Sequence, residues 1–165
     1  MKEKTITTRI KECSYDELAA DDRELVDAAK EITRTSYVPY SHFHVGAAIR
    51  MADGSIVRGS NQENAAFPSG TCAERTAAFQ ASALNPGMAF KKIAIAAWTR
   101  LHESDSTPHE LCFQRKPISP CGACRQALLE YENAYGPIEV ILYGLDTVYI
   151  LPSVASLLPL CFTEF

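Results

Sequence analysis

Three cysteines have the spacing most suited to chemistry. Cys121 and Cys124 form a Cys-x-x-Cys pair at the predicted start of a helix, and Cys72 opens a second predicted helix. The pair alone is compatible with metal binding, with disulfide exchange or with no function. Cys72 favours metal binding, because two helix N-termini can converge in one α/β layer and their partial positive charge stabilises thiolates. Three thiolates leave one position of a tetrahedral zinc ion open, which is typical of catalytic sites.

Two charged residues follow Cys72 closely. Glu74 would lie in the first turn of the helix, where its carboxylate could accept a proton from zinc-bound water and pass it on. Arg75 would offset the negative charge of three thiolates around one divalent ion. Without the cysteines, simpler interpretations would be preferred: an acidic residue that favours a helix N-terminus, and a surface ion pair.

Turn signals and hydrophobic spacing predict the elements that position these residues. We expect a helix from the Ser14 capping box to before Pro39, strands over 42–50 and 55–60, a helix over 72–85, a strand over 93–98, a helix over 121–136, and strands over 139–143 and 147–151. The polar segment 100–117 lacks a clear period and is expected to be a loop. A hairpin followed by alternating helices and strands predicts an α/β domain with a mixed sheet of five strands.

Length and composition exclude several classes of protein. The chain of 165 residues is expected to form one domain, 1–165. Its net charge of −4 argues against general electrostatic binding to nucleic acid. No apolar run approaches the ~20 residues of a membrane span, and the charged N-terminus lacks the apolar core of a signal peptide. We therefore expect a cytoplasmic protein, in which clustered cysteines bind metal or act in catalysis rather than form disulfides.

Four blocks of the sequence stand in the order seen in cytidine deaminases, the small nucleoside-level enzymes, and the chain resembles that family. The blocks are Tyr40–Ala48, Asn61–Ala66, Cys72–Ala77 and Pro120–Gln126. The resemblance implies a three-layer α/β/α fold and one zinc ion held by Cys72, Cys121 and Cys124. It also implies hydrolytic deamination of cytidine and 2′-deoxycytidine to uridine and 2′-deoxyuridine plus ammonia, a reaction of pyrimidine salvage.

The resemblance assigns roles to further residues. Glu74 would carry protons to N3 of the base and to the leaving amine. Asn61 and Glu63 would hydrogen-bond the ribose 3′-hydroxyl, Phe43 would line the base, and Ala73 would offer its backbone N–H to the base. Phe43 equally fits a core-facing strand position, and Asn61 and Glu63 also fit ordinary turn chemistry.

Chains of this size in the family are usually homotetramers whose sites draw on more than one subunit. Phe162 is the candidate to reach a neighbouring site, although it also fits a hydrophobic anchor for the tail. Phe67 stands where many relatives have tyrosine, and the loop over 100–117 is longer than usual. These two departures leave room for an altered pocket or a different assembly.

Three other hypotheses stay open at this stage. The same zinc chemistry could act on a cytosine-containing antibiotic nucleoside, as in the related blasticidin deaminases. A non-catalytic binding module would need a fourth ligand, from Cys13, Cys112 or Cys161, all of which are expected to be small buried hydrophobes. A redox Cys-x-x-Cys protein would not need Cys72 or Glu74. His102 and His109 match no metal-binding spacing and are expected in solvent.

Overall fold

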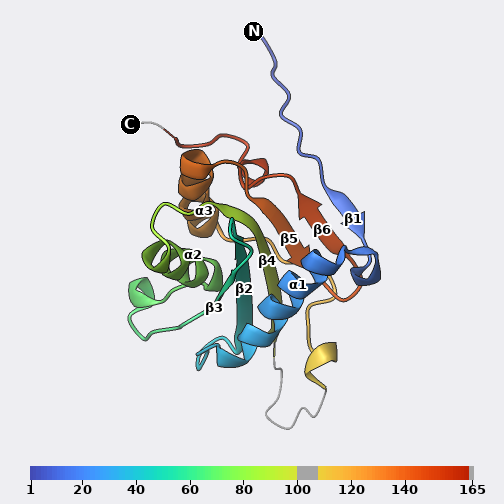
Figure 1. Ribbon diagram of the computed structural model, residues 1–165, viewed down its shortest axis with the longest axis vertical. Helices are drawn as coiled ribbons and strands as arrows, with labels where there is room; N and C mark the ends of the chain where they lie inside the picture. Colours follow the sequence, from blue (N-terminus) through green and yellow to red (C-terminus); the bar gives the residue numbers. More distant parts are fainter. Residues whose placement is uncertain (100–107, 164–165) are drawn as a thin grey trace.

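A mixed six-stranded sheet separates two layers of helices in the computed structural model, which describes residues 1–99 and 108–163 (Figure 1). The strands are β1 (Lys11–Cys13), β2 (Phe43–Met51), β3 (Ile56–Ser60), β4 (Phe90–Thr99), β5 (Glu139–Tyr143) and β6 (Val148–Leu151). They lie in the order β1-β6-β5-β4-β2-β3. Among the strands of the described residues, only β4 and β5 pair in parallel, and the other neighbours are antiparallel. The predicted three-layer α/β/α fold is confirmed.

The sixth strand corrects the prediction of five. β1 contains only Lys11, Glu12 and Cys13, and it pairs with β6 at one edge of the sheet. So short a segment shows no alternation of apolar and polar side chains. Its pairing depends on backbone hydrogen bonds to a strand more than 130 residues later, which no local pattern reveals.

In the part of the chain that the structure describes, three α-helices cover the sheet: α1 (Ala20–Ile32) on one face, and α2 (Ala73–Leu84) and α3 (Gly122–Tyr135) together on the other (Figure 1). None of the described helices is long and apolar enough to cross a membrane. The Ser14 capping box forms, since Glu17 accepts the Ser14 backbone N–H at 2.7 Å, but it caps a short 3₁₀ turn. The first helix therefore begins later than its sequence signal predicts.

Alternating side chains of the central strands fill two separate cores. On β2, Val45 and Ile49 face the layer of α2 and α3. On β4, Ile95 faces the same layer, whereas Ala96 and Trp98 pack in the α1 layer. The two-residue period of a strand accounts for the division into two cores, because successive side chains point to opposite faces of the sheet. Small side chains such as Ala96 let the helical layers lie close to these strands.

The loop expected before the second cysteine motif is more ordered than predicted where it is described. His109 lies in a 3₁₀ turn with Nε2 3.0 Å from Oγ1 of Thr33. Its ring packs edge-on against Trp98 and Phe113. The expectation of a solvated His109 is therefore wrong, because contacts across the α1 layer bury part of the ring. His102 lies outside the described residues.

A glycine lets α2 approach the edge strand of the sheet. A Cβ atom on Gly59 of β3 would lie 2.4 Å from the backbone nitrogen of Ala77 and 2.8 Å from the carbonyl oxygen of Ala73. Both atoms belong to the backbone of α2 and cannot swing aside. Residue 59 must lack a side chain for the start of α2, with Cys72 and Glu74, to keep its position on the sheet.

We predict that Gly59→Ala destabilises the protein by about 1–3 kcal/mol, the usual cost of overpacking, because α2 must shift. Gly122→Ala is the matched control, since a Cβ at that position meets no atom within 4 Å. Urea unfolding followed by circular dichroism measures both changes in the free energy of unfolding. A G59A protein as stable as G122A would contradict this account of the α2 contact.

Candidate active site

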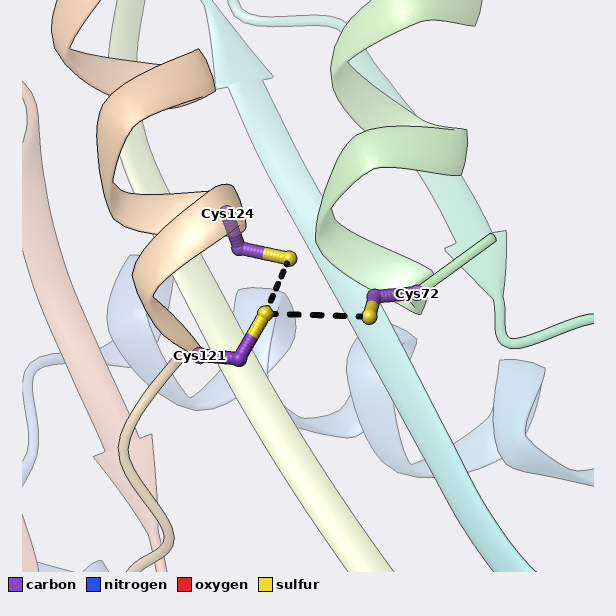
Figure 2. Close-up of side chains that lie close together, drawn as sticks. All are labelled: Cys72, Cys121 and Cys124. Carbon is purple, nitrogen blue, oxygen red and sulfur yellow. Dashed lines mark hydrogen bonds between the residues drawn. The ribbon is translucent and has the colours of Figure 1, made fainter. Parts of the chain in front are cut away.

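The three predicted ligands converge at the N-termini of α2 and α3 (Figure 2). Cys72 is the N-cap residue of α2, Cys121 is the N-cap residue of α3, and Cys124 lies in the first turn of α3. The Sγ atom of Cys121 lies 3.9 Å from that of Cys72 and 3.4 Å from that of Cys124. Two segments about fifty residues apart in the chain thus bring their thiols together.

The spacing of the sulfur atoms fits a zinc ion. Zinc–thiolate bonds of about 2.3 Å in tetrahedral geometry separate the sulfurs by about 3.8 Å. All three sulfurs lie within 4.8 Å of one another, and no other group of three or more possible ligands occurs in the described part of the chain. Cys13 and Cys112 are half-buried and Cys161 is exposed, so the expectation that all three are buried is wrong. None of them completes a four-cysteine site.

The surroundings of Cys72 favour its thiolate. The hydrogen bond from Cys124, with a further one from Arg75, lowers the pKa of Cys72 to about 5 although burial opposes the shift. Nη2 of Arg75 lies 3.8 Å from the Cys72 sulfur. The pKa of Cys124 is raised because its thiol donates to Cys72 and because it is buried. The position of Arg75 fits the charge-balancing role expected of it.

Glu74 is buried beside the cysteines, with 4% of its surface exposed. Burial raises the pKa of its carboxyl group, and the neighbouring negative charge of Cys72 raises it further. A hydrogen bond from the backbone of Glu74 and the charge of Arg75 only partly oppose the shift. A carboxylate with a raised pKa is a better proton acceptor than an ordinary one.

An open cavity of about 320 Å³ lies next to Cys72 and Arg75. This volume suits a small molecule. It is lined by Tyr40, Asn61, Gln62, Glu63, Asn64, Phe67, Gly70, Thr71, Cys72 and Arg75. Tyr40 and Gln62 lie inside the motif blocks but were not singled out in the sequence, and Gly70 and Thr71 carry no sequence signal. The fold brings these loop residues to the cavity.

Asn61 lines the cavity and also organises the start of β2. Its Oδ1 accepts the backbone N–H of Val45 at 2.9 Å, and its Nδ2 donates to the carbonyl oxygen of Phe43 at 2.8 Å. An amide has two donor hydrogens and two acceptor lone pairs, so one of each stays available for a ligand. Asn61 therefore joins the cavity wall to the strand that carries Phe43.

Glu63 holds the loop before β2. Its Oε2 accepts the backbone N–H groups of Tyr40 at 2.9 Å and of Ser41 at 3.3 Å. Desolvation opposes ionisation, but hydrogen bonds from Ser41 and Tyr40 outweigh it and lower the pKa of Glu63. The group is thus an ionised acceptor at neutral pH, and its backbone contacts use only part of its acceptor capacity.

Six predicted site residues are absent from the cavity lining: Cys121, Cys124 and Glu74, described above, and Phe43, Ala73 and Phe162. Phe43 is half-buried and packs against the core on the α2 and α3 side. Ala73 is fully buried as the first residue of α2. Phe162 is 64% exposed on the tail, where its carbonyl oxygen accepts a hydrogen bond from Nε2 of Gln126 at 2.9 Å. A single chain therefore does not bring Phe162 to the cavity wall.

An α/β/α domain with three converging thiols and a buried carboxyl beside a small cavity has the parts of a metal-dependent hydrolase. Residues 19–135 match the family described as the cytidine and deoxycytidylate deaminase zinc-binding region. The chain belongs to this family.

Individual relatives agree with this assignment. A cytidine deaminase from Sporosarcina psychrophila is 39% identical over 145 residues, which are 87% of this chain and 93% of the relative. A crystal structure of cytidine deaminase from Burkholderia pseudomallei has a TM-score of 0.67 and 39% identity, covering 84% of this chain and 97% of that one. A blasticidin-S deaminase from Bacillus cereus is 29% identical over 147 residues, which are 89% of this chain and 96% of the relative.

We predict that Cys72→Ala, Cys121→Ala and Cys124→Ala each reduce bound zinc from one ion per chain to well below one, because two thiolates rarely hold the ion alone. Cys13→Ala is the control and should retain one zinc, since Cys13 lies outside the cluster. Elemental analysis of the gel-filtered proteins measures the ratio. Full zinc content in a cluster variant would contradict the assigned ligand set.

Proposed function

We propose that this chain deaminates cytidine and 2′-deoxycytidine by hydrolysis at C4 of the base, producing uridine or 2′-deoxyuridine and ammonia. The observation that carries the proposal is the cluster of three thiols and the buried Glu74 beside a cavity of about 320 Å³. Family membership and close relatives named as cytidine deaminases support the same reaction. Such a reaction would serve pyrimidine salvage.

Cys72, Cys121 and Cys124 would hold the zinc ion, which when bound supplies Lewis-acid activation of a water molecule for attack on C4. Glu74 would move the protons. Its raised pKa suits it to accept the two protons of that water in turn, delivering the first to N3 and the second to the amine, which leaves as ammonia. Arg75 would limit the negative charge that the three thiolates bring to the site.

Residues in the cavity wall and next to it would orient the nucleoside. Ala73 is the first residue of α2, so its backbone N–H has no partner within the helix and can donate to the base. Glu63 would accept the ribose 3′-hydroxyl, with Asn61 beside it. Phe43 would contribute to the base site from the start of β2, whose backbone Asn61 holds.

We predict that Glu74→Ala lowers kcat for cytidine by about 10²–10⁴-fold or more, because the proton carrier is lost while the zinc ligands stay. Loss of absorbance as cytidine becomes uridine measures the rate. Glu130→Ala is the matched control and should retain wild-type activity, since Glu130 lies exposed on α3.

Equal rates for Glu74→Ala and the wild type would contradict the role of Glu74. A zinc-loaded wild-type protein that leaves cytidine unchanged would overturn the substrate assignment. Modified cytosine nucleosides, including blasticidin S, would then be tested in the same assay.

Assembly and location complete the proposal. We expect a homotetramer in the cytoplasm that acts on free nucleosides and binds neither nucleic acid nor membranes. Two exposed aromatic side chains support assembly: Phe67 at the cavity, 82% exposed, and Phe162 on the tail. In a tetramer Phe162 of one chain would reach the cavity of a neighbour and help to cover its open side.

A tetramer has four times the 18.2 kDa of one chain, which light scattering after gel filtration measures. We predict that Phe162→Ala keeps this mass and raises KM for cytidine several-fold, because one wall of the neighbouring site is lost. A monomeric wild-type protein with full activity would contradict the shared site.

A further inference from the structure

The geometry points to Arg125 as a positioning residue that holds the loop carrying Cys121 in place for zinc. This inference rests on the proposed zinc site and adds a residue of α3 that is neither a ligand nor part of the cavity wall. The side chain is half-buried and uses all three guanidinium nitrogens as donors.

Arg125 contacts three consecutive residues of the loop. Its backbone N–H donates to the carbonyl oxygen of Cys121 at 3.0 Å, which closes the first turn of α3. Its Nε donates to the carbonyl oxygen of Pro120 at 2.8 Å, and its Nη2 donates to Oγ of Ser119 at 3.0 Å. One residue thus holds the carbonyl group of the peptide that joins Pro120 to Cys121, the carbonyl group of Cys121 and the hydroxyl group of Ser119.

Cys121 needs such support more than Cys124, the other ligand from α3. Cys124 lies within α3 and is fully buried, whereas Cys121 is an exposed N-cap residue with extended backbone (φ −66°, ψ 164°). The residue before it, Pro120, is buried and has no N–H of its own. Its carbonyl oxygen must find a donor when buried, and Arg125 provides it.

The third guanidinium nitrogen of Arg125 links this loop to the C-terminal segment by a hydrogen bond. Nη1 donates to the carbonyl oxygen of Leu157 at 2.8 Å. Nearby, the carboxylate of Glu132 on the same helix accepts the backbone N–H groups of Val154 at 2.7 Å and Ala155 at 2.9 Å. The segment around Leu157 is therefore a fixed support, and Arg125 links the zinc loop to it.

The arrangement depends on the three hydrogen-bond donors of the guanidinium group, rather than on its positive charge. A cation near the N-terminus of a helix opposes the helix dipole, so charge alone does not favour Arg at this position. A lysine would keep the charge but offers one ammonium group, which cannot reach three acceptors in different directions. Lysine and glutamine variants therefore separate geometry from charge.

The test measures zinc retention rather than activity. Zinc-loaded wild type, Arg125→Lys, Arg125→Gln and Arg115→Gln are mixed with excess 4-(2-pyridylazo)resorcinol, and zinc release is followed by its absorbance. We expect both Arg125 variants to release zinc about 10–100-fold faster than the wild type, the usual effect of losing a group that orients a metal ligand. Arg115→Gln is the control, because that exposed arginine pairs only with Asp146 in the described structure.

Melting temperatures with and without zinc exclude a general loss of stability. The positioning role predicts that the rise in Tm produced by zinc shrinks in both Arg125 variants. An equal fall of the zinc-free and zinc-loaded Tm, with unchanged release, would show a purely structural role and overturn the inference. Wild-type release from Arg125→Lys but not from Arg125→Gln would assign the effect to charge and would also overturn it. A wild type that binds no zinc would instead refute the proposed function.

Discussion

The convergence of two helix N-termini is the constraint on which the site depends. β3 and β4 both run antiparallel to β2, so they run parallel to each other, and β5 runs parallel to β4. The helices that follow β3 and β4 therefore start at the same end of these strands. Because α2 and α3 also cover the same face, their first turns meet there and bring their thiols together (Figures 1 and 2). The topology of the sheet thus places the partial positive charges of two helix N-termini next to the three sulfur atoms.

The surroundings of two carboxyl groups near the site shift their pKa values in opposite directions. Glu74 is buried in the first turn of α2, and burial raises its pKa. Glu63 lies in a loop where hydrogen bonds from Ser41 and Tyr40 lower its pKa. One group is thereby suited to carrying protons and the other to accepting hydrogen bonds as a stable anion. The difference comes from solvation and hydrogen bonding, since the side chains are chemically alike.

α3 also connects the site to the end of the chain. Arg125, Gln126 and Glu132 all bond to backbone atoms of the C-terminal segment, from Val154 to Phe162. These contacts hold a stretch that has little regular structure of its own. The helix that supplies two of the three thiols is thus also hydrogen-bonded to the C-terminal segment.

The local sequence already determined the chemistry of the site. Cysteine spacing, helix caps and strand alternation are encoded by neighbouring residues, so Cys72, Cys121, Cys124, Glu74 and the main elements could all be predicted. Only the tertiary structure decided that β1 joins the sheet and that His109 packs against Thr33, at the C-terminal end of α1. It also decided that Gly59 leaves space for α2, and that Asn61 and Arg125 form hydrogen bonds with distant backbone atoms. Each of these depends on contacts between segments far apart in the chain, and the free energy of such contacts is defined only once the fold has brought them together.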